Sequence, residues 1–150
     1  MLVQTDGTPF DWFGIGKKYS LHGYIDDATS KILGLYMCEN ECLMGYLEIT
    51  RQMLKKYGSP VAIYSDKYSV FFPTSSQKVT LEEELQGKEK PTTQYKRIMD
   101  FLGIELIAAS TSQAKGRIER LWETLQDRLV TEFKLNNIKT MYFLTFLNHI

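Results

Sequence analysis

The chain has few of the side chains that build disulfide scaffolds or zinc fingers. Its 150 residues include two cysteines, Cys38 and Cys42, and two histidines, His22 and His149. The Cys-Glu-Asn-Glu-Cys spacing suits a metal site locally, but no second pair of ligands follows in a zinc-finger pattern. We therefore interpret the two cysteines as free thiols in a reducing compartment.

The chain also lacks a net charge and a long apolar run. Lysine plus arginine and aspartate plus glutamate number 18 each, so the formal net charge is zero. No overall electrostatic attraction to nucleic acid is expected, and binding to a polyanion would need a local cluster of basic residues. No apolar run reaches the length of a transmembrane helix, so we expect no membrane partner.

The residues that are present indicate a globular domain with a sizeable core. Hydrophobic residues make up 43% and charged residues 24% of the chain, which is one domain in length. The 8 Phe, 9 Tyr and 2 Trp could fill a core or stack on bases, and composition does not choose between these roles. A strand-like run starts at Leu2 and an apolar segment reaches Ile150, so we expect a domain cut from a longer protein.

Hydrophobic periodicity predicts a mixed α/β fold. Three β-rich runs close in sequence favour an antiparallel meander, and helical and strand-like runs then alternate. The predicted strands are 2–6, 21–26, 31–37, 61–64 and 104–109, and the predicted helices are 41–58, 94–103, 112–129 and 138–149. This order predicts a five-stranded sheet, three strands antiparallel and then two parallel, flanked by helices. The polar stretch at about 73–94 is predicted to be a long, functional or mobile insertion.

Two aspartates lie on strands that such a sheet brings together. Asp6 is in the strand 2–6, and Asp66 follows the strand 61–64. If these strands are neighbours, both carboxylates reach one edge of the sheet, where open α/β sheets bind ligands. Two adjacent carboxylates repel each other, and a cation relieves that repulsion. Because hard divalent cations prefer oxygen ligands, the pattern predicts a magnesium-type site.

A third carboxylate comes from the helix 112–129. Its apolar stripe comprises Ile118, Leu121, Trp122, Leu125 and Leu129. At about 100° per residue, Glu119 falls beside that stripe, so we expect it to be half-buried and directed toward the sheet. The expectation is that Glu119 converges with the two aspartates.

Each acid also has an ordinary structural explanation. Asp6 could be a hydrogen-bonded strand residue, Asp66 a turn former, and Glu119 a member of a helical ion pair. The pair Asp26-Asp27 is interpreted as a turn whose side chains satisfy the backbone. Taken singly, the ordinary explanations suffice, and only the predicted convergence of the three acids favours a shared site.

Basic residues gather around Glu119 although the net charge is zero. Lys115, Arg117 and Arg120 surround the acid, and Lys67 is beside Asp66. A local positive cluster of this kind suits a phosphodiester substrate, so these four residues are candidate contacts to its phosphates. The alternative for the two arginines, a solvated helix surface, stays open.

Several of these segments carry a family resemblance. "QTDGTPFDWF", "YSDKYSVF" and "AKGRIERLWETLQDRL", in this order, resemble the catalytic core of DDE transposases and retroviral-type integrases. The opening segment is most similar to the bacterial insertion-sequence branch. The similarity extends from residue 2 to about residue 133.

The resemblance implies a ribonuclease H-like fold and a catalytic, metal-binding trio formed by Asp6, Asp66 and Glu119. In this family two Mg²⁺ or Mn²⁺ ions lie between such acids when DNA is bound, and they support DNA cleavage and strand transfer. It also implies double-stranded DNA partners, namely element ends and target, and a homo-oligomer. The implied location is the bacterial cytoplasm, with the nucleoid as the place of action.

The chain departs from the retroviral pattern in one spacing. Asp66 and Glu119 are further apart than in retroviral-type integrases, and the stretch 73–94 accounts for the excess. We expect the family's usual N-terminal DNA-binding region to lie outside these 150 residues, so that an isolated fragment could be inactive. Two alternatives stay open: a catalytically inactive assembly or DNA-scaffolding domain, and a related nuclease on the same fold.

Overall fold

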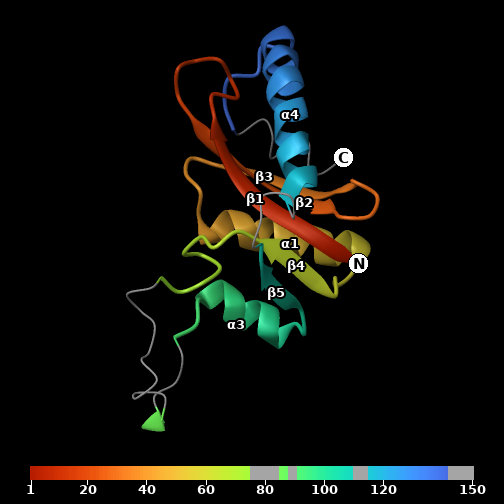
Figure 1. Cartoon of the computed structure of the whole chain (residues 1–150). Helices are drawn as coiled ribbons and strands as arrows, with labels where there is room; N and C mark the ends of the chain where they lie inside the picture. Colours follow the sequence, from red (N-terminus) through yellow and green to blue (C-terminus); the bar gives the residue numbers. More distant parts are fainter. Residues whose placement is uncertain (75–84, 88–90, 110–114, 142–150) are drawn as a thin grey trace.

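One mixed sheet organises the chain (Figure 1). The computed structural model describes residues 1–74, 85–87, 91–109 and 115–141. The strands are β1 (Leu2–Phe10), β2 (Tyr19–Asp26), β3 (Ile32–Cys38), β4 (Ala62–Ser65) and β5 (Glu105–Ala108). Their order is β3-β2-β1-β4-β5; β2 is antiparallel to β1 and β3, whereas β4 is parallel to β1 and β5. The predicted fold class is therefore confirmed.

Helices cover both faces of the sheet. They are α1 (Leu43–Tyr57), α3 (Gln94–Phe101) and α4 (Gly116–Leu135). Figure 1 shows α1 and α3 on one side of the sheet and α4 on the other. None of the helices in the described part of the chain combines the length and apolar character needed to cross a bilayer.

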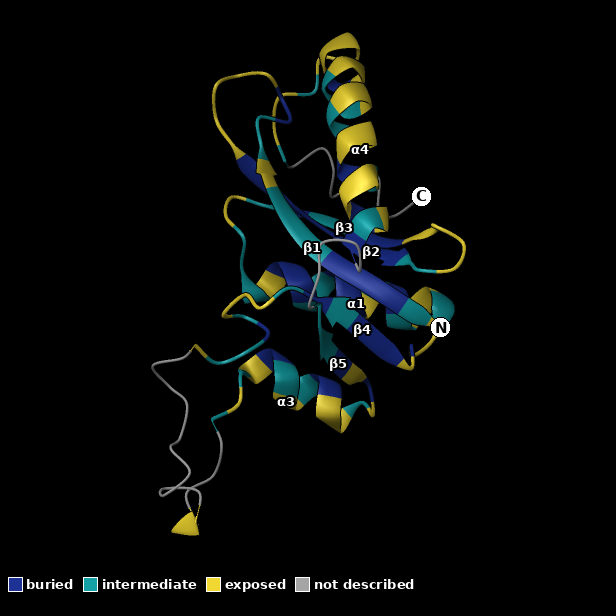
Figure 2. Ribbon diagram, in the orientation of Figure 1, coloured by how far each residue is buried: buried dark blue, intermediate teal, exposed yellow. Residues whose placement is uncertain are grey.

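The two-residue period of the strands divides the buried side chains between two cores. On β2, Leu21 and Ile25 pack in the cluster that contains Ile118 and Trp122 of α4. Tyr24, one position out of phase, packs in the cluster that includes side chains of α1 and α3. Figure 2 shows the result, with buried strands in the middle and exposed helix faces outside. Among the described helices, α4 thus packs on the opposite face of the sheet from α1 and α3.

Some predicted boundaries differ from the structure. β1 continues to Phe10 because it pairs with β2 along its whole length, up to the pair Phe10–Tyr19. The helix α4 is first described at Gly116, and 112–114 lie outside the described residues. Residues 138–141 are not helical, and the rest of the predicted helix 138–149 lies outside the described residues, as does most of 73–94.

His22 is a buried polar residue in the middle of β2. Its ring is fully buried, contacts Tyr46 edge-to-face at 4.7 Å between centroids, and leaves no room for a Cβ on Gly45. Nε2 accepts a hydrogen bond from the Cys42 amide at 3.2 Å, and Nδ1 lies 3.3 Å from the Tyr36 carbonyl oxygen. Burial lowers the pKa of His22 to about 4, so the ring is neutral near pH 7.

This burial predicts a specific loss of stability in acid. An unfolded histidine titrates near 6.5, so between pH 6.5 and about 4 the unfolded chain binds a proton that the native chain does not. The free energy of unfolding should therefore fall as the pH falls through this window, by roughly 3 kcal/mol from His22 alone. Urea denaturation in metal-free buffer across this range measures it. His22→Gln is the control, and its profile should lack this component; parallel profiles for the two proteins would contradict the assignment.

Candidate functional site

The sheet register places Asp6 and Asp66 side by side. β1 and β4 are parallel neighbours, with Leu2 opposite Ala62 and Gln4 opposite Tyr64. Continued by two residues, the same offset brings Asp6 beside Asp66. Because β4 ends at Ser65, Asp66 is the first residue beyond the carboxyl end of that strand. This is the edge where open α/β sheets bind their ligands.

One ammonium group lies between the two aspartates. Lys115 Nζ is 2.8 Å from Asp6 Oδ1 and 3.7 Å from Asp66 Oδ2. The lysine side chain is 9% exposed, against 19% for Asp6 and 48% for Asp66. The other oxygen of Asp66 accepts the Tyr68 amide at 3.0 Å, so Asp66 is both a turn residue and part of the acidic pair. A shared cation offsets the repulsion between the two carboxylates.

A polar ladder joins β1 to α4. Its three hydrogen bonds run from Ile118 N to Gln4 Oε1 at 3.1 Å, from Trp122 Nε1 to Asp6 Oδ2 at 3.1 Å, and from Gln126 Nε2 to Thr8 Oγ1 at 3.4 Å. Two residues of a strand advance about 6.7 Å and four residues of a helix about 6 Å, so successive partners stay in step. The ladder fixes α4 along β1 and fixes the carboxylate of Asp6.

A third carboxylate, which the sequence did not reveal, lies beside this pair. Glu41 is in the loop between β3 and α1 and accepts a hydrogen bond from the Tyr46 hydroxyl. A Cβ on Gly7 would lie 3.0 Å from the Glu41 carboxyl carbon, which places the acid against the backbone next to Asp6. Burial, and then the charges of Asp6 and Asp66, raise the pKa of Glu41. Nothing in the local sequence distinguishes Glu41 from Glu39, so only the fold shows its place.

Glu119 differs from its predicted setting. It lies in the first turn of α4, but it is exposed and not half-buried. Within the described part of the chain it makes no hydrogen bond or ion pair. The physical reason is that Glu119 and Asp6 carry like charges and repel each other, and the cation beside Asp6, Lys115, is already shared with Asp66. The structure thus brings Asp6 and Asp66 together and leaves the Glu119 carboxylate outside their contacts.

The basic candidates divide into buried and exposed residues. Lys115 is held by the aspartates, whereas Lys67, Arg117 and Arg120 are exposed. Arg117 donates to Ser30 Oγ at 2.7 Å and lies 3.8 Å from an Asp27 oxygen. The exposed part of the expected basic cluster therefore consists of three side chains, and one of these, Arg117, already contacts Ser30 and Asp27.

The two aspartates of the turn, Asp26 and Asp27, have the structural role that the sequence indicated. Asp26 Oδ2 accepts hydrogen bonds from the amide and hydroxyl of Thr29, the first at 3.1 Å. Asp27 Oδ1 accepts the Gln4 side-chain amide at 2.6 Å. Both carboxylates are used by the turn and by the Gln4 contact.

Comparison with known proteins adds to this geometry. No protein-family model matches the chain. It is 42% identical over 138 residues to the putative transposase y4bF of Sinorhizobium fredii, covering 91% of this chain and 28% of that protein. It is 39% identical over 140 residues to the transposase for insertion sequence IS1202 of Streptococcus pneumoniae, covering 93% and 29%. This chain is related to insertion-sequence transposases. It spans less than a third of the length of the curated relatives it matches.

Solved structures identify the fold. The magnesium complex of the HTLV-2 integrase catalytic core domain, in its trimeric form, matches with a TM-score of 0.63 and 14% identity, covering 93% of this chain and 76% of that chain. The simian T-cell lymphotropic virus intasome, in complex with the PP2A regulatory subunit B56 gamma, matches with a TM-score of 0.67 and 16% identity, covering 98% of this chain and 46% of that chain. The transposase-related chain thus has the integrase-core fold that its motifs predicted.

The donor set around Asp6 fits a hard divalent cation. Asp6 and Asp66 direct one oxygen each toward the same ammonium, and Glu41 is near enough for its pKa to respond to both. Two carboxylates thus contact one lysine charge and a third carboxylate is near them, so negative charge is in excess. All the acidic donors are oxygens, which Mg²⁺ and Mn²⁺ prefer.

The hydrogen bond from Trp122 to Asp6 should contribute to stability as well as to geometry. Trp122→Phe keeps an aromatic ring and removes the N–H donor to a carboxylate that is largely buried. The free energy of unfolding should fall by about 1.5–3 kcal/mol, the usual range for a hydrogen bond to a charged group. Urea denaturation measures this change.

A double-mutant cycle with Asp6→Asn separates the hydrogen bond from the loss of ring volume. The two substitutions should couple by about 0.5 kcal/mol or more, because the partners are in direct contact. Additive effects would show that the indole N–H does not position Asp6.

Proposed function

We propose that this chain is the catalytic core of a transposase of the DDE type, which cleaves DNA at element ends and joins them to target DNA. The observation that carries the proposal is the convergence of Asp6 and Asp66 on one cation, at the ligand-binding edge of an integrase-type sheet. The kinship with insertion-sequence transposases supports the same chemistry. Residues 1–150 would form one catalytic domain of a longer protein, with the insertion at about 73–94.

In the proposed site, Asp6 and Asp66 hold divalent metal, with two Mg²⁺ or Mn²⁺ ions when DNA is bound. Such ions supply a Lewis acid that activates the attacking oxygen and stabilises the leaving oxygen in an in-line displacement. The chain's own part is to hold the carboxylates in place. Trp122 and the β1–α4 ladder orient Asp6, and the Tyr68 amide orients Asp66. Lys115 keeps the two acids compatible while the metal is absent.

Helix geometry supports Glu119 as the third ligand. At 100° per residue, Glu119 lies about 40° around α4 from Lys115 and about 60° from Trp122. Both of these neighbours contact Asp6, so Glu119 extends from the flank of α4 that borders the aspartates. Its carboxylate has no other partner among the described residues and is free to turn toward a cation.

The exposed basic residues would hold the DNA backbone. Arg117 and Arg120 follow Lys115 on the first turn of α4, and Lys67 follows Asp66, so all three lie next to the acids in sequence. Lys115 would join them by leaving the aspartates when metal enters. The working form would be a homo-oligomer on double-stranded DNA, as the trimeric and dimeric forms and the intasome of the structural neighbours suggest.

Removal of any one carboxylate should abolish strand cleavage. In the full-length protein, Asp66→Asn, Asp6→Asn or Glu119→Gln should lower the rate of nicking at element ends by about 10³-fold or more, because each removes a ligand of an ion that contributes several kcal/mol. The assay is cleavage of a DNA end with Mg²⁺ or Mn²⁺. Glu123→Gln, an exposed acid one turn along α4, is the matched control and should retain activity.

Two outcomes would contradict this assignment. Cleavage that survives Asp66→Asn excludes the acidic pair from the chemistry. A wild-type protein that binds DNA but never cuts it, with or without metal, would favour the scaffolding alternative.

Arg117 and Arg120 should contribute electrostatically to DNA affinity. The double change to alanine should weaken binding to all sequences and reduce the slope of log K against log salt by about 2, since each phosphate contact contributes about 0.9. Fluorescence anisotropy over a range of salt concentrations measures the slope. Arg51→Ala removes an arginine that is paired with Glu48 on α1, and it should leave the slope unchanged. An unaltered slope in the double variant would assign both arginines to solvated surface.

A further inference from the structure

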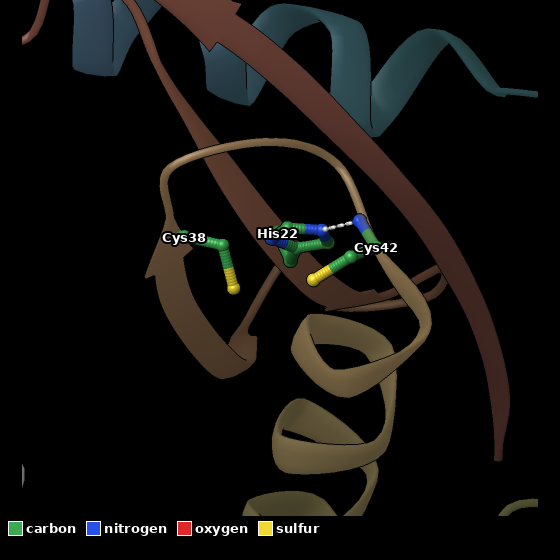
Figure 3. A group of neighbouring side chains, drawn as sticks. All are labelled: His22, Cys38 and Cys42. Carbon is green, nitrogen blue, oxygen red and sulfur yellow. Dashed lines mark hydrogen bonds between the residues drawn. The ribbon is translucent and has the colours of Figure 1, made fainter.

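The fold brings His22 close to Cys38 and Cys42, for which the sequence indicated no further metal ligand. Cys38 ends β3 and Cys42 precedes the first residue of α1, while His22 lies on β2, the neighbouring strand. The ligand atoms of these three residues all lie within 4.8 Å of one another. Figure 3 shows both thiols next to the imidazole ring. In the described residues no other group of three histidine, cysteine or acidic side chains is gathered this closely.

The spacing of the three ligand atoms is close to that of a tetrahedral metal site. Zinc binds sulfur at about 2.3 Å and histidine nitrogen at about 2.0–2.1 Å, so neighbouring ligand atoms lie roughly 3.5–3.8 Å apart. The present arrangement needs a closure of about 1 Å. Both cysteines are only half-buried, and Cys42 makes no side-chain cap to α1, so the thiols can move.

The imidazole is held in the tautomer that a metal requires. A backbone amide donates to Nε2 and a carbonyl oxygen faces Nδ1, so the proton is on Nδ1 and the lone pair is on Nε2. Metal-bound histidines commonly donate their other N–H to a backbone carbonyl in this way. A metal ion would take the place of the Cys42 amide at Nε2.

The charges of the three ligands suit a divalent ion. A divalent ion bound to two thiolates and a neutral imidazole forms a centre of zero net charge, and the two thiol protons pass to solvent. Sulfur and nitrogen donors favour zinc over the hard ions that suit the aspartates.

We propose that His22, Cys38 and Cys42 bind a zinc ion, with solvent as the fourth ligand. The site is separate from the acidic pair and does not depend on the proposed transposase activity. It has a structural consequence, because Glu41 lies in the loop between the two cysteines. Zinc would fix that loop and with it the carboxylate beside Asp6.

Cobalt titration of the chain, reduced and stripped of metal, tests the proposal. Co²⁺ should give the thiolate-to-metal charge-transfer band of a sulfur-ligated ion, saturating at one equivalent and bleached by Zn²⁺. Cys38→Ser and Cys42→Ser should each lose most of the band. The double variant Asp6→Asn/Asp66→Asn should keep it, since that variant removes only oxygen ligands.

Thermal denaturation provides a second measurement. Zinc at a hundredfold excess over its Kd should raise the Tm of the wild type by about 5–10 °C, and it should raise the Tm of either serine variant much less. The proposal is overturned if the folded, reduced wild type gives no charge-transfer band, or if the band persists in both serine variants. It is also overturned if mass spectrometry shows that the two thiols form a disulfide under reducing conditions.

Discussion

The arrangement of this molecule depends on the hydrogen bonds between β1 and α4. They form because two residues of a strand and four residues of a helix advance by nearly the same distance. Three alternate residues of β1, Gln4, Asp6 and Thr8, are hydrogen-bonded to three residues of α4 that are spaced four apart, Ile118, Trp122 and Gln126. A packed apolar face alone would let α4 slide or rotate along the sheet, because the hydrophobic effect is not directional. The polar contacts remove that freedom, since a shift by one residue would leave buried donors and acceptors unpaired.

The acidic site follows from this constraint. Because Trp122 holds one oxygen of Asp6, the other oxygen is directed to the edge where β4 ends. The parallel register then adds Asp66, and the β3–α1 loop adds Glu41. Negative charge accumulates there, and Lys115 at the start of α4 offsets part of it. The same helix carries Glu119, so the element that positions the first aspartate also positions the proposed third ligand.

Local patterns were sufficient to predict the fold class and the positions of the two aspartates. The alternation on β2 and the apolar stripe of α4 follow from period alone, and the pairing of Asp6 with Asp66 follows from strand order. Contacts between residues far apart in the chain could not be predicted from the sequence. Glu41 and His22 acquire their neighbours from the packing of α1 against the sheet, which no spacing along the chain encodes. The exposure of Glu119 was also missed, because helical phase gives a direction around the axis and does not include the repulsion between Glu119 and the two aspartates.

Diffraction from metal-bound crystals would show whether Asp6, Asp66 and Glu119 form one metal site. A crystal soaked with Mn²⁺ and measured at the manganese absorption edge would locate the ions by their anomalous signal. We expect an ion coordinated by Asp6 and Asp66, with the Lys115 ammonium moved away from both and the Glu119 carboxylate turned toward the ion. Manganese absent from this edge of the sheet, with Lys115 still between the two aspartates, would contradict this expectation.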